Sequence, residues 1–139
     1  MIQLIALGLL LLVNMVATAE EACTWMNKET ASGILGNEAS GSTTRSTCEF
    51  THGADHLRIE VFVPSAQFRS YLSRCKSAPE ALRAIGNEAV LCDGGASEQI
   101  AIGRVRDQVF VLSVKAPFPK PQLRDKLKLA AELVSGNLF

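Results

Sequence analysis

The chain is poor in the residues that mark many functional classes. Aromatic residues make up 6% of the sequence, with one Trp and one Tyr, and 14 basic residues are balanced by 14 acidic ones. No basic face or tail stands out, and platforms that stack single-stranded nucleic acid need aromatic side chains. The composition therefore argues against a nucleic-acid partner.

Signatures of catalysis and metal binding are also missing. The sequence has no G-x-S-x-G, H-E-x-x-H, P-loop or G-x-G-x-x-G pattern, and no C-x-x-C pair. His52, Asp55 and His56 surround a glycine turn, where the simpler interpretation is the polar tip of a hairpin. Glu38 and Glu88 could form a carboxylate pair, but turn and strand-edge chemistry explains them more simply. The sequence predicts no enzyme, no cofactor and no metal site.

The first 19 residues have the pattern of a secretory signal. Residues 2–16 are almost wholly apolar, and an Ala-x-Ala site for signal peptidase ends at Ala19. We expect cleavage there, with an uncleaved membrane anchor or a lipid on Cys23 as alternatives. The mature chain, residues 20–139, is then one secreted or periplasmic domain without a stable membrane span.

A four-residue motif occurs twice in the mature chain. Gly-Asn-Glu-Ala occupies Gly36–Ala39 and again Gly86–Ala89, each time with one cysteine before it and one after it. The repeat suggests two similar half-units, each closed by its own disulfide, although four cysteines allow three pairings. Each link would contribute about 3 kcal/mol in the chain-entropy model. The expected pairs are Cys23–Cys48 and Cys75–Cys92.

Hydrophobic periodicity predicts an α+β domain. Its fold is expected to be an antiparallel sheet of about five strands flanked by helices, in the order αββαβββα. The strand at 108–115 is apolar on both faces, which predicts a central position covered on both sides. The predicted helices are Lys28–Leu35 between Asn27 and Gly36, one capped by Ser65 that includes Phe68, Leu72 and Cys75, a short stretch within 77–86, and one from Pro121 that buries Leu123, Leu127, Ala130 and Val134. The predicted strands are 47–51, 57–63, 88–92, 98–105 and 108–115.

Two loops are the expected binding surface. A Gly/Ser/Thr-rich loop at 37–46 and a turn at 93–95 both follow the repeated motif, so a pseudo-symmetric fold would place them comparably. Loops on a rigid scaffold carry recognition more often than the scaffold does, although ordinary flexible connections are the alternative. The outer face of the last helix is expected to carry solvated charge and to be a poor site. The candidate residues are Ser40, Ser42, Thr43, Asp93 and Gly94.

The chain resembles a known family. A cysteine near the mature start, Cys48-Glu49-Phe50 after the first helix, and Ile85 followed by the second motif are similar to small exported bacterial domains with the PsbP-like α/β/α fold. These domains include actinobacterial LpqN-type lipoproteins. The resemblance implies a sheet between helices and an accessory or binding role in the envelope, and it carries over no functional residue. Unlike the lipoproteins, this chain lacks a convincing lipobox.

The expected function is therefore an exported, non-enzymatic accessory or binding domain. Its partner would be an envelope protein or a small ligand. The alternative is a small extracytoplasmic hydrolase or an enzyme inhibitor. A polar triad around Ser or His would favour that alternative, and the sequence displays none.

Overall fold

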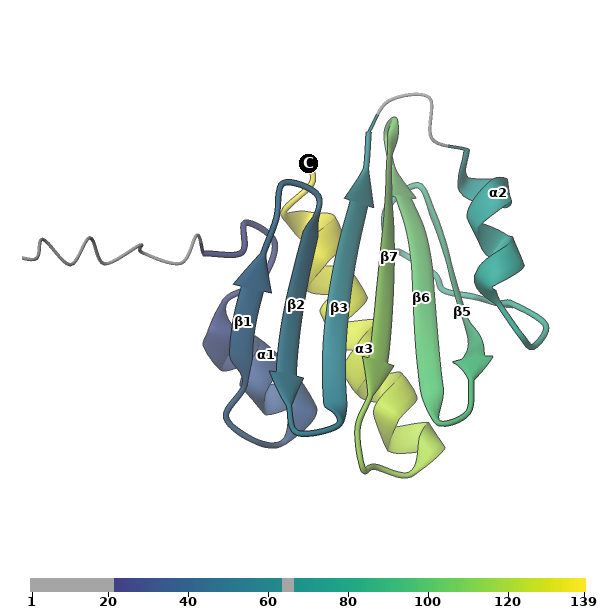
Figure 1. The fold of residues 1–139 in the computed structure, drawn as a ribbon. Helices are drawn as coiled ribbons and strands as arrows, with labels where there is room; N and C mark the ends of the chain where they lie inside the picture. The colour runs from purple at the N-terminus through teal and green to yellow at the C-terminus, as the bar shows by residue number, and fades with distance from the viewer. Residues whose placement is uncertain (1–21, 64–66) are drawn as a thin grey trace, which may run out of the picture.

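The computed structural model describes residues 22–63 and 67–139. They form one seven-stranded antiparallel sheet with helices packed on it (Figure 1). The helices are α1 (Lys28–Leu35), α2 (Phe68–Tyr71), the 3-10 helix η1 (Leu72–Arg74) and α3 (Lys120–Gly136). The strands are β1 (Ser40–Thr43), β2 (Thr47–His52), β3 (Asp55–Phe62), β4 (Glu80–Ala81), β5 (Glu88–Gly95), β6 (Glu98–Val105) and β7 (Gln108–Lys115). The expected signal, its cleavage site and the Ser65 cap lie outside the described residues.

The broad α+β class fits, but the expected five-strand sheet and the order αββαβββα are wrong. One missed strand is β1, within the segment expected to be a loop. Its Gly/Ser/Thr composition has weak strand propensity, yet Gly41 lies directly opposite Phe50, whose ring is buried. Pairing with β2 therefore overrides the local preference, as strand propensity depends strongly on context.

The second missed strand is β4, within the segment expected to be helical. The Cys75–Cys92 disulfide draws this part of the chain alongside β5. Lys76 N–H then donates to the Asp93 carbonyl at 2.7 Å, and Ser77 Oγ accepts the Asp93 N–H at 2.9 Å. These bonds align the following residues with β5. That segment therefore adds a strand to the sheet instead of forming a helix.

Two boundaries also differ from expectation. The second helix was expected to be continuous as far as Cys75, but α2 ends at Tyr71 and η1 follows it. The Asp93-Gly94-Gly95 turn was expected to break the strand, but β5 runs through Gly95 with a register shift between Asp93 and Gly95. A bulge of this kind absorbs an extra residue without ending the strand.

The sheet joins two three-strand meanders. Its order, β1-β2-β3-β7-β6-β5-β4, places β1-β2-β3 beside β7-β6-β5. The repeated motif begins each meander, and its Gly36 and Gly86 adopt positive φ angles of 77° and 58°, where glycine is unstrained. Ala39 and Ala89 are both buried in the same core. The first copy of the motif thus leads into β1, the outer strand at one edge of the sheet. The second copy leads into β5, which is next to the outer strand at the other edge.

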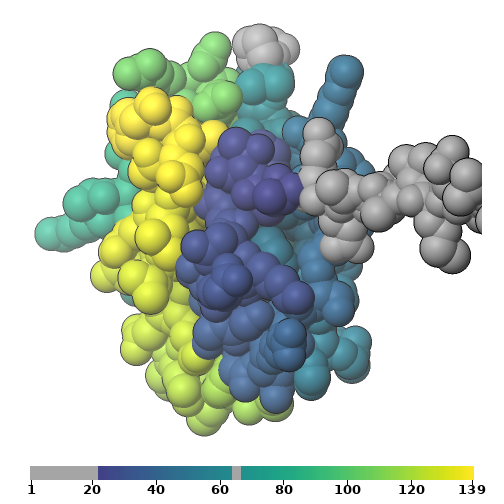
Figure 2. All heavy atoms as spheres, turned by 90° about the vertical axis from the view of Figure 1, so that its left-hand side faces the viewer, coloured from purple at the N-terminus to yellow at the C-terminus, as the bar shows by residue number. Residues whose placement is uncertain are grey.

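The sheet is covered unequally on its two faces. Helices α1 and α3 lie behind it in Figure 1, over a core that extends across both meanders. Figure 2 shows the N-terminal part of the described chain packed beside α3, where Asn137 Nδ2 donates to the Trp25 carbonyl at 2.9 Å. Helix α2 packs on the opposite face against a smaller cluster on β5, β6 and β7. We call these the α1/α3 face and the α2 face.

Several expected packing features are confirmed. Strand β7 is central and buried on both faces, with Phe110 and Leu112 on the α1/α3 face and Val109 and Val111 on the α2 face. Helix α1 has the expected bounds, with Asn27 Oδ1 accepting the Thr30 N–H at 2.8 Å. The buried stripe of α3 contains the four expected residues, Leu123, Leu127, Ala130 and Val134, together with Ala131 and Ser135.

Two disulfides are present, and they lie on different faces. Cys23–Cys48 ties the N-terminal segment to β2 on the α1/α3 face, whereas Cys75–Cys92 ties the end of η1 to β5 on the α2 face. The pairs are those that the repeat suggests, but their positions in the two meanders are not equivalent. Disulfides persist in oxidising compartments, so they are consistent with a secreted or extracellular location. None of the helices in the described ranges has the length and apolar character that a membrane crossing requires.

Removing the Cys75–Cys92 disulfide should destabilise the protein. The Cys75→Ser/Cys92→Ser variant should lose about 2–5 kcal/mol in free energy of unfolding, measured by urea denaturation, because the link constrains the unfolded chain. Replacing both cysteines avoids a free thiol. Non-reducing peptide mapping provides the check on connectivity, and a peptide that joins Cys23 or Cys48 to either of the other two would contradict the pairing.

Gly103 should not tolerate a side chain. It lies directly opposite Phe110, whose buried ring occupies the position that a Cβ atom would take. Gly103→Ala should therefore cost about 1–3 kcal/mol by overpacking. Gly33→Ala is the matched control, because Gly33 is exposed in α1 with open space around it and should gain about 0.5–1 kcal/mol. Equal effects of the two substitutions in urea denaturation would contradict this account.

Candidate functional site

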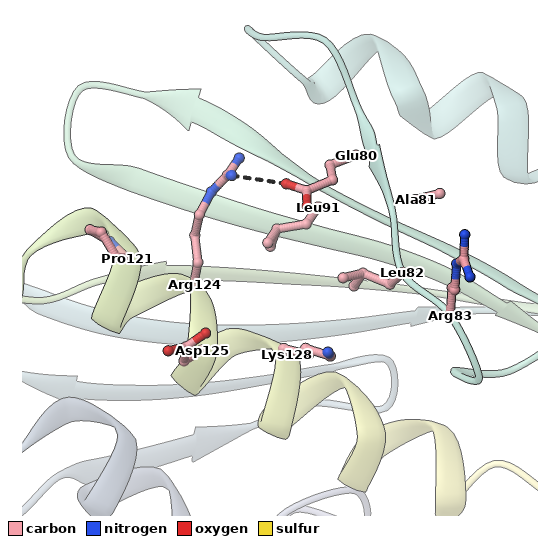
Figure 3. Close-up of a pocket in the computed structure, with 9 residues that line it drawn as sticks. All are labelled: Glu80, Ala81, Leu82, Arg83, Leu91, Pro121, Arg124, Asp125 and Lys128. Atoms are coloured by element: carbon pink, nitrogen blue, oxygen red, sulfur yellow. Dashed lines mark hydrogen bonds and ion pairs between the residues drawn. The ribbon is translucent and has the colours of Figure 1, made fainter.

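An open groove lies between β4 and the first half of α3 (Figure 3). Its volume is about 450 Å³, and we call it the β4–α3 groove. Leu91 of β5 contributes apolar lining, and Arg83, Arg124 and Lys128 contribute cationic groups. Glu80 and Asp125 provide carboxylates, so the groove combines an apolar surface with mixed charge, three cations against two anions.

Arg124 is held in a fixed orientation at this groove. Its Nη1 donates to Glu80 Oε2 at 3.0 Å, the bond drawn in Figure 3, and its Nε donates to Gln99 Oε1 at 3.1 Å. Gln99 is only 4% exposed, so it provides a rigid support. A guanidinium anchored on two sides loses little conformational entropy when a ligand binds to it.

The same network continues to the end of the sheet. Gln99 Nε2 donates to Asp93 Oδ1 at 2.6 Å, and Lys120 Nζ lies 2.9 Å from the Asp93 carboxylate. These bonds connect α3 to β5 and β6, and a second hollow of about 440 Å³ opens beside them. The hydrogen bond from Lys120, and then that from Gln99, lowers the pKa of Asp93 below its ordinary value. Asp93 is bonded to both Lys120 of α3 and Gln99 of β6, so this part of the network serves mainly to fix α3 on the sheet.

A further hollow lies beside the edge strand β1. Its volume is about 410 Å³, and it is enclosed by the N-terminal segment, the start of α1 and β1 itself. Met26 and Phe50 contribute apolar atoms, Cys23 lies beside them, and Gly41 leaves room that any other residue would fill. We call this space the β1 hollow.

The structure does not bring the expected binding residues together. Ser40, Ser42 and Thr43 lie in β1 at one edge of the sheet, and Thr43 and Ser40 line the β1 hollow. Asp93 and Gly94 lie in the last part of β5, near the other edge. Strands β1 and β5 also run in opposite directions, because five antiparallel steps separate them. The two candidate loops are therefore two separate surfaces, both inside strands.

The outer face of α3 is not uniformly charged, contrary to expectation. Leu129 and Leu133 are 54% and 42% exposed on it. The residues missed by sequence reasoning lie on the same helix: Lys120, Arg124 and Lys128 recur every four residues and form one stripe toward β4 and β5. That spacing was the available signal, but its meaning depends on β4, which the sequence did not reveal.

The histidines and the two motif glutamates take separate structural roles. His52 Nδ1 lies 2.9 Å from the Glu38 carbonyl, and His56 Nε2 lies 3.4 Å from Glu98 Oε2. Glu88 bonds to Arg104 at 3.2 Å. It lies in β5, near the opposite edge of the sheet from Glu38, which precedes β1. Within the described ranges, no three His, Cys, Asp or Glu side chains converge as metal ligands.

Comparison with known proteins finds no relative of this chain. No protein family, curated protein or solved structure matches the chain.

Asp93→Asn should destabilise the protein in a pH-dependent way. A carboxylate with a lowered pKa stabilises the folded state fully above the ordinary Asp pKa, and this stabilisation is lost as pH falls through the folded-state pKa. The variant should therefore have a lower Tm at neutral pH, and the difference from wild type should shrink in strongly acidic solution. Asp107→Asn, at an exposed turn that suits either residue, is the control. A Tm difference that stays constant to low pH would contradict the role of the charge.

Proposed function

We propose that this chain is an exported, disulfide-stabilised accessory domain that binds an anionic group of an envelope protein or small ligand in the β4–α3 groove. The observation that carries the proposal is the anchored Arg124 together with two further cations, Arg83 and Lys128, in a groove whose carboxylates are Glu80 and Asp125. Among the described residues, the ion pairs include neither Arg83 nor Lys128. These two cations are exposed at the groove and available to a ligand.

The chemistry of the groove favours recognition of a carboxylate or phosphate. A guanidinium offers a planar pair of donors that matches either group, and Lys supplies additional positive charge. The apolar lining at Leu91 and the open shape suit a side chain or a short segment of a partner. The resemblance to PsbP-like exported domains favours the same kind of role, and an extracytoplasmic, non-enzymatic function is part of the proposal.

Charge reversal in the groove should abolish capture of the partner. Arg83→Glu/Lys128→Glu should reduce recovery of a saturable partner from envelope extract by about tenfold or more, equivalent to about 1.4 kcal/mol. Arg69→Glu/Arg106→Glu makes the same change in net charge on exposed residues away from the groove, and it should bind like wild type. Binding should also weaken as salt rises. Equal recovery by both variants would overturn the groove as the site.

Activity profiling tests the non-enzymatic part separately. The purified protein should show no turnover above background against ester, peptide and glycoside libraries. Reproducible turnover that disappears on replacement of one polar residue would overturn this part of the proposal, and the position of that residue would identify the active site.

A further inference from the structure

The outer edge of β1 presents backbone groups that the described residues do not pair with another strand. The turn bond from Thr44 N–H to the Thr47 carbonyl, 2.8 Å, makes these residues a hydrogen-bonded pair. Bonded and non-bonded pairs alternate along an antiparallel ladder, so Ser42 bonds to β2. Gly41 and Thr43 then turn their N–H and C=O groups outward.

The first outward donor before β1 is already satisfied. Ala39 N–H points to the same side as that of Gly41, and Ser32 Oγ of α1 accepts it at 3.0 Å. Helix α1 thus protects the beginning of this edge and stops short of the strand. Between Ser40 and Thr43 there is no proline and no charged residue, the features that usually keep an exposed edge from pairing.

The other meander shows how an equivalent edge is covered. In β5, the residues directly after Ala89 of the motif are Val90 and Leu91, and they pair with Ala81 and Glu80 of β4. In β1, the residues directly after Ala39 are Ser40 and Gly41, and their pairing partners in the described structure lie only in β2. The same place in the two meanders is therefore covered by a strand at one edge and open at the other.

We propose that a second copy of this chain covers the open edge. The two β1 strands would run antiparallel about a two-fold axis at Ser42, joining the two sheets into one. Gly41 of each copy then lies opposite Thr43 of the other, and the outward N–H and C=O groups of these residues bond to one another. This register is self-complementary, as a two-fold interface requires.

The side chains fit the same register. Gly41 and Thr43 lie on the α1/α3 face, since they pair with Phe50 and Cys48. Residues directly opposite in a ladder share a face, so Thr43 of the second copy lies next to Gly41, at the β1 hollow. The absent side chain at Gly41 provides the room, and the second copy adds its own Thr43 to the lining of the hollow.

Charge favours this occupant at both ends of the seam. The register places the β1–β2 turn of one copy, which contains Arg45, beside the residues just before β1 of the other copy, which include Glu38. The Glu38 side chain is 89% exposed. Its nearest cation in its own chain is Lys28, whose Nζ lies 3.9 Å from Glu38 Oε1, a long ion pair. Opposite charges therefore approach one another twice, and the uncharged segment between them places no like charges in contact. The seam is short, so the dimer is expected to be weak and concentration-dependent.

Analytical ultracentrifugation of the purified protein over a wide concentration range tests the proposal. Wild type should dimerise reversibly, and Thr43→Pro should raise the dimer Kd by about tenfold or more, because it removes an outward N–H without touching the bonds to β2. Ala81→Pro is the matched control at the opposite edge. Leu82 N–H donates to the Ala89 carbonyl, so Ala81 also faces outward, and this variant should dimerise like wild type.

A charge swap makes the test independent of any folding defect in the proline variant. Arg45→Glu and Glu38→Arg should each weaken the dimer, and the double variant should restore it. Gly41→Val should also weaken the dimer by filling the β1 hollow. A protein that stays monomeric at millimolar concentration, a Thr43→Pro variant that dimerises normally, or a double swap without recovery would each overturn the proposal. The assay uses this chain alone, so its outcome is separate from binding in the β4–α3 groove.

Discussion

The pairing of β3 with β7 is the interaction on which the rest of the structure depends. It is the point where the two meanders meet, and it aligns seven residue pairs from His56↔Lys115 to Phe62↔Val109. Each meander alone has a ladder of local hairpins, and among the described strand pairings only this one joins residues far apart in sequence. Because β7 is buried on both faces, the junction also decides where α3 and α2 must pack. Loop closure before such long-range pairing is the costly step in forming a sheet of this kind.

The features that could be predicted from the sequence are those with local causes. Helix α1 begins after Asn27, whose side chain accepts the Thr30 N–H, and it ends at Gly36, whose left-handed backbone lets its N–H bond to the Ser32 carbonyl. The β6–β7 hairpin has its expected bounds because both strands are strongly apolar and the turn residues are polar. In each case the evidence lies within a few residues of the element, so the sequence alone is sufficient.

The features that could not be predicted depend on distant partners. Strands β1 and β4 have no alternating apolar pattern, and each forms because a neighbouring strand offers unpaired backbone groups. The β4–α3 groove could not be predicted for the same reason. The orientation of Arg124 is set by Gln99 on β6 and Glu80 on β4, which lie 25 and 44 positions away in the sequence. A basic stripe on a helix is visible in the sequence, but the wall that turns it into a groove is not.

The positions of the cysteines explain why the two edges of the sheet differ. Cys92 lies in β5, so its disulfide to Cys75 holds the following segment along the outer side of that strand, where it becomes β4 and one wall of the groove. Cys48 lies in β2, the second strand of its meander, whereas β5 is the first strand of the other, and the disulfide from Cys48 to Cys23 crosses the α1/α3 face instead of running along the edge. That disulfide helps to enclose the β1 hollow, but it does not place another strand of the described chain beside β1. A repeated motif thus begins both meanders, while the placement of one cysteine in each decides that β5 is flanked by a further strand of the chain and that β1 is flanked in the described structure by β2 alone.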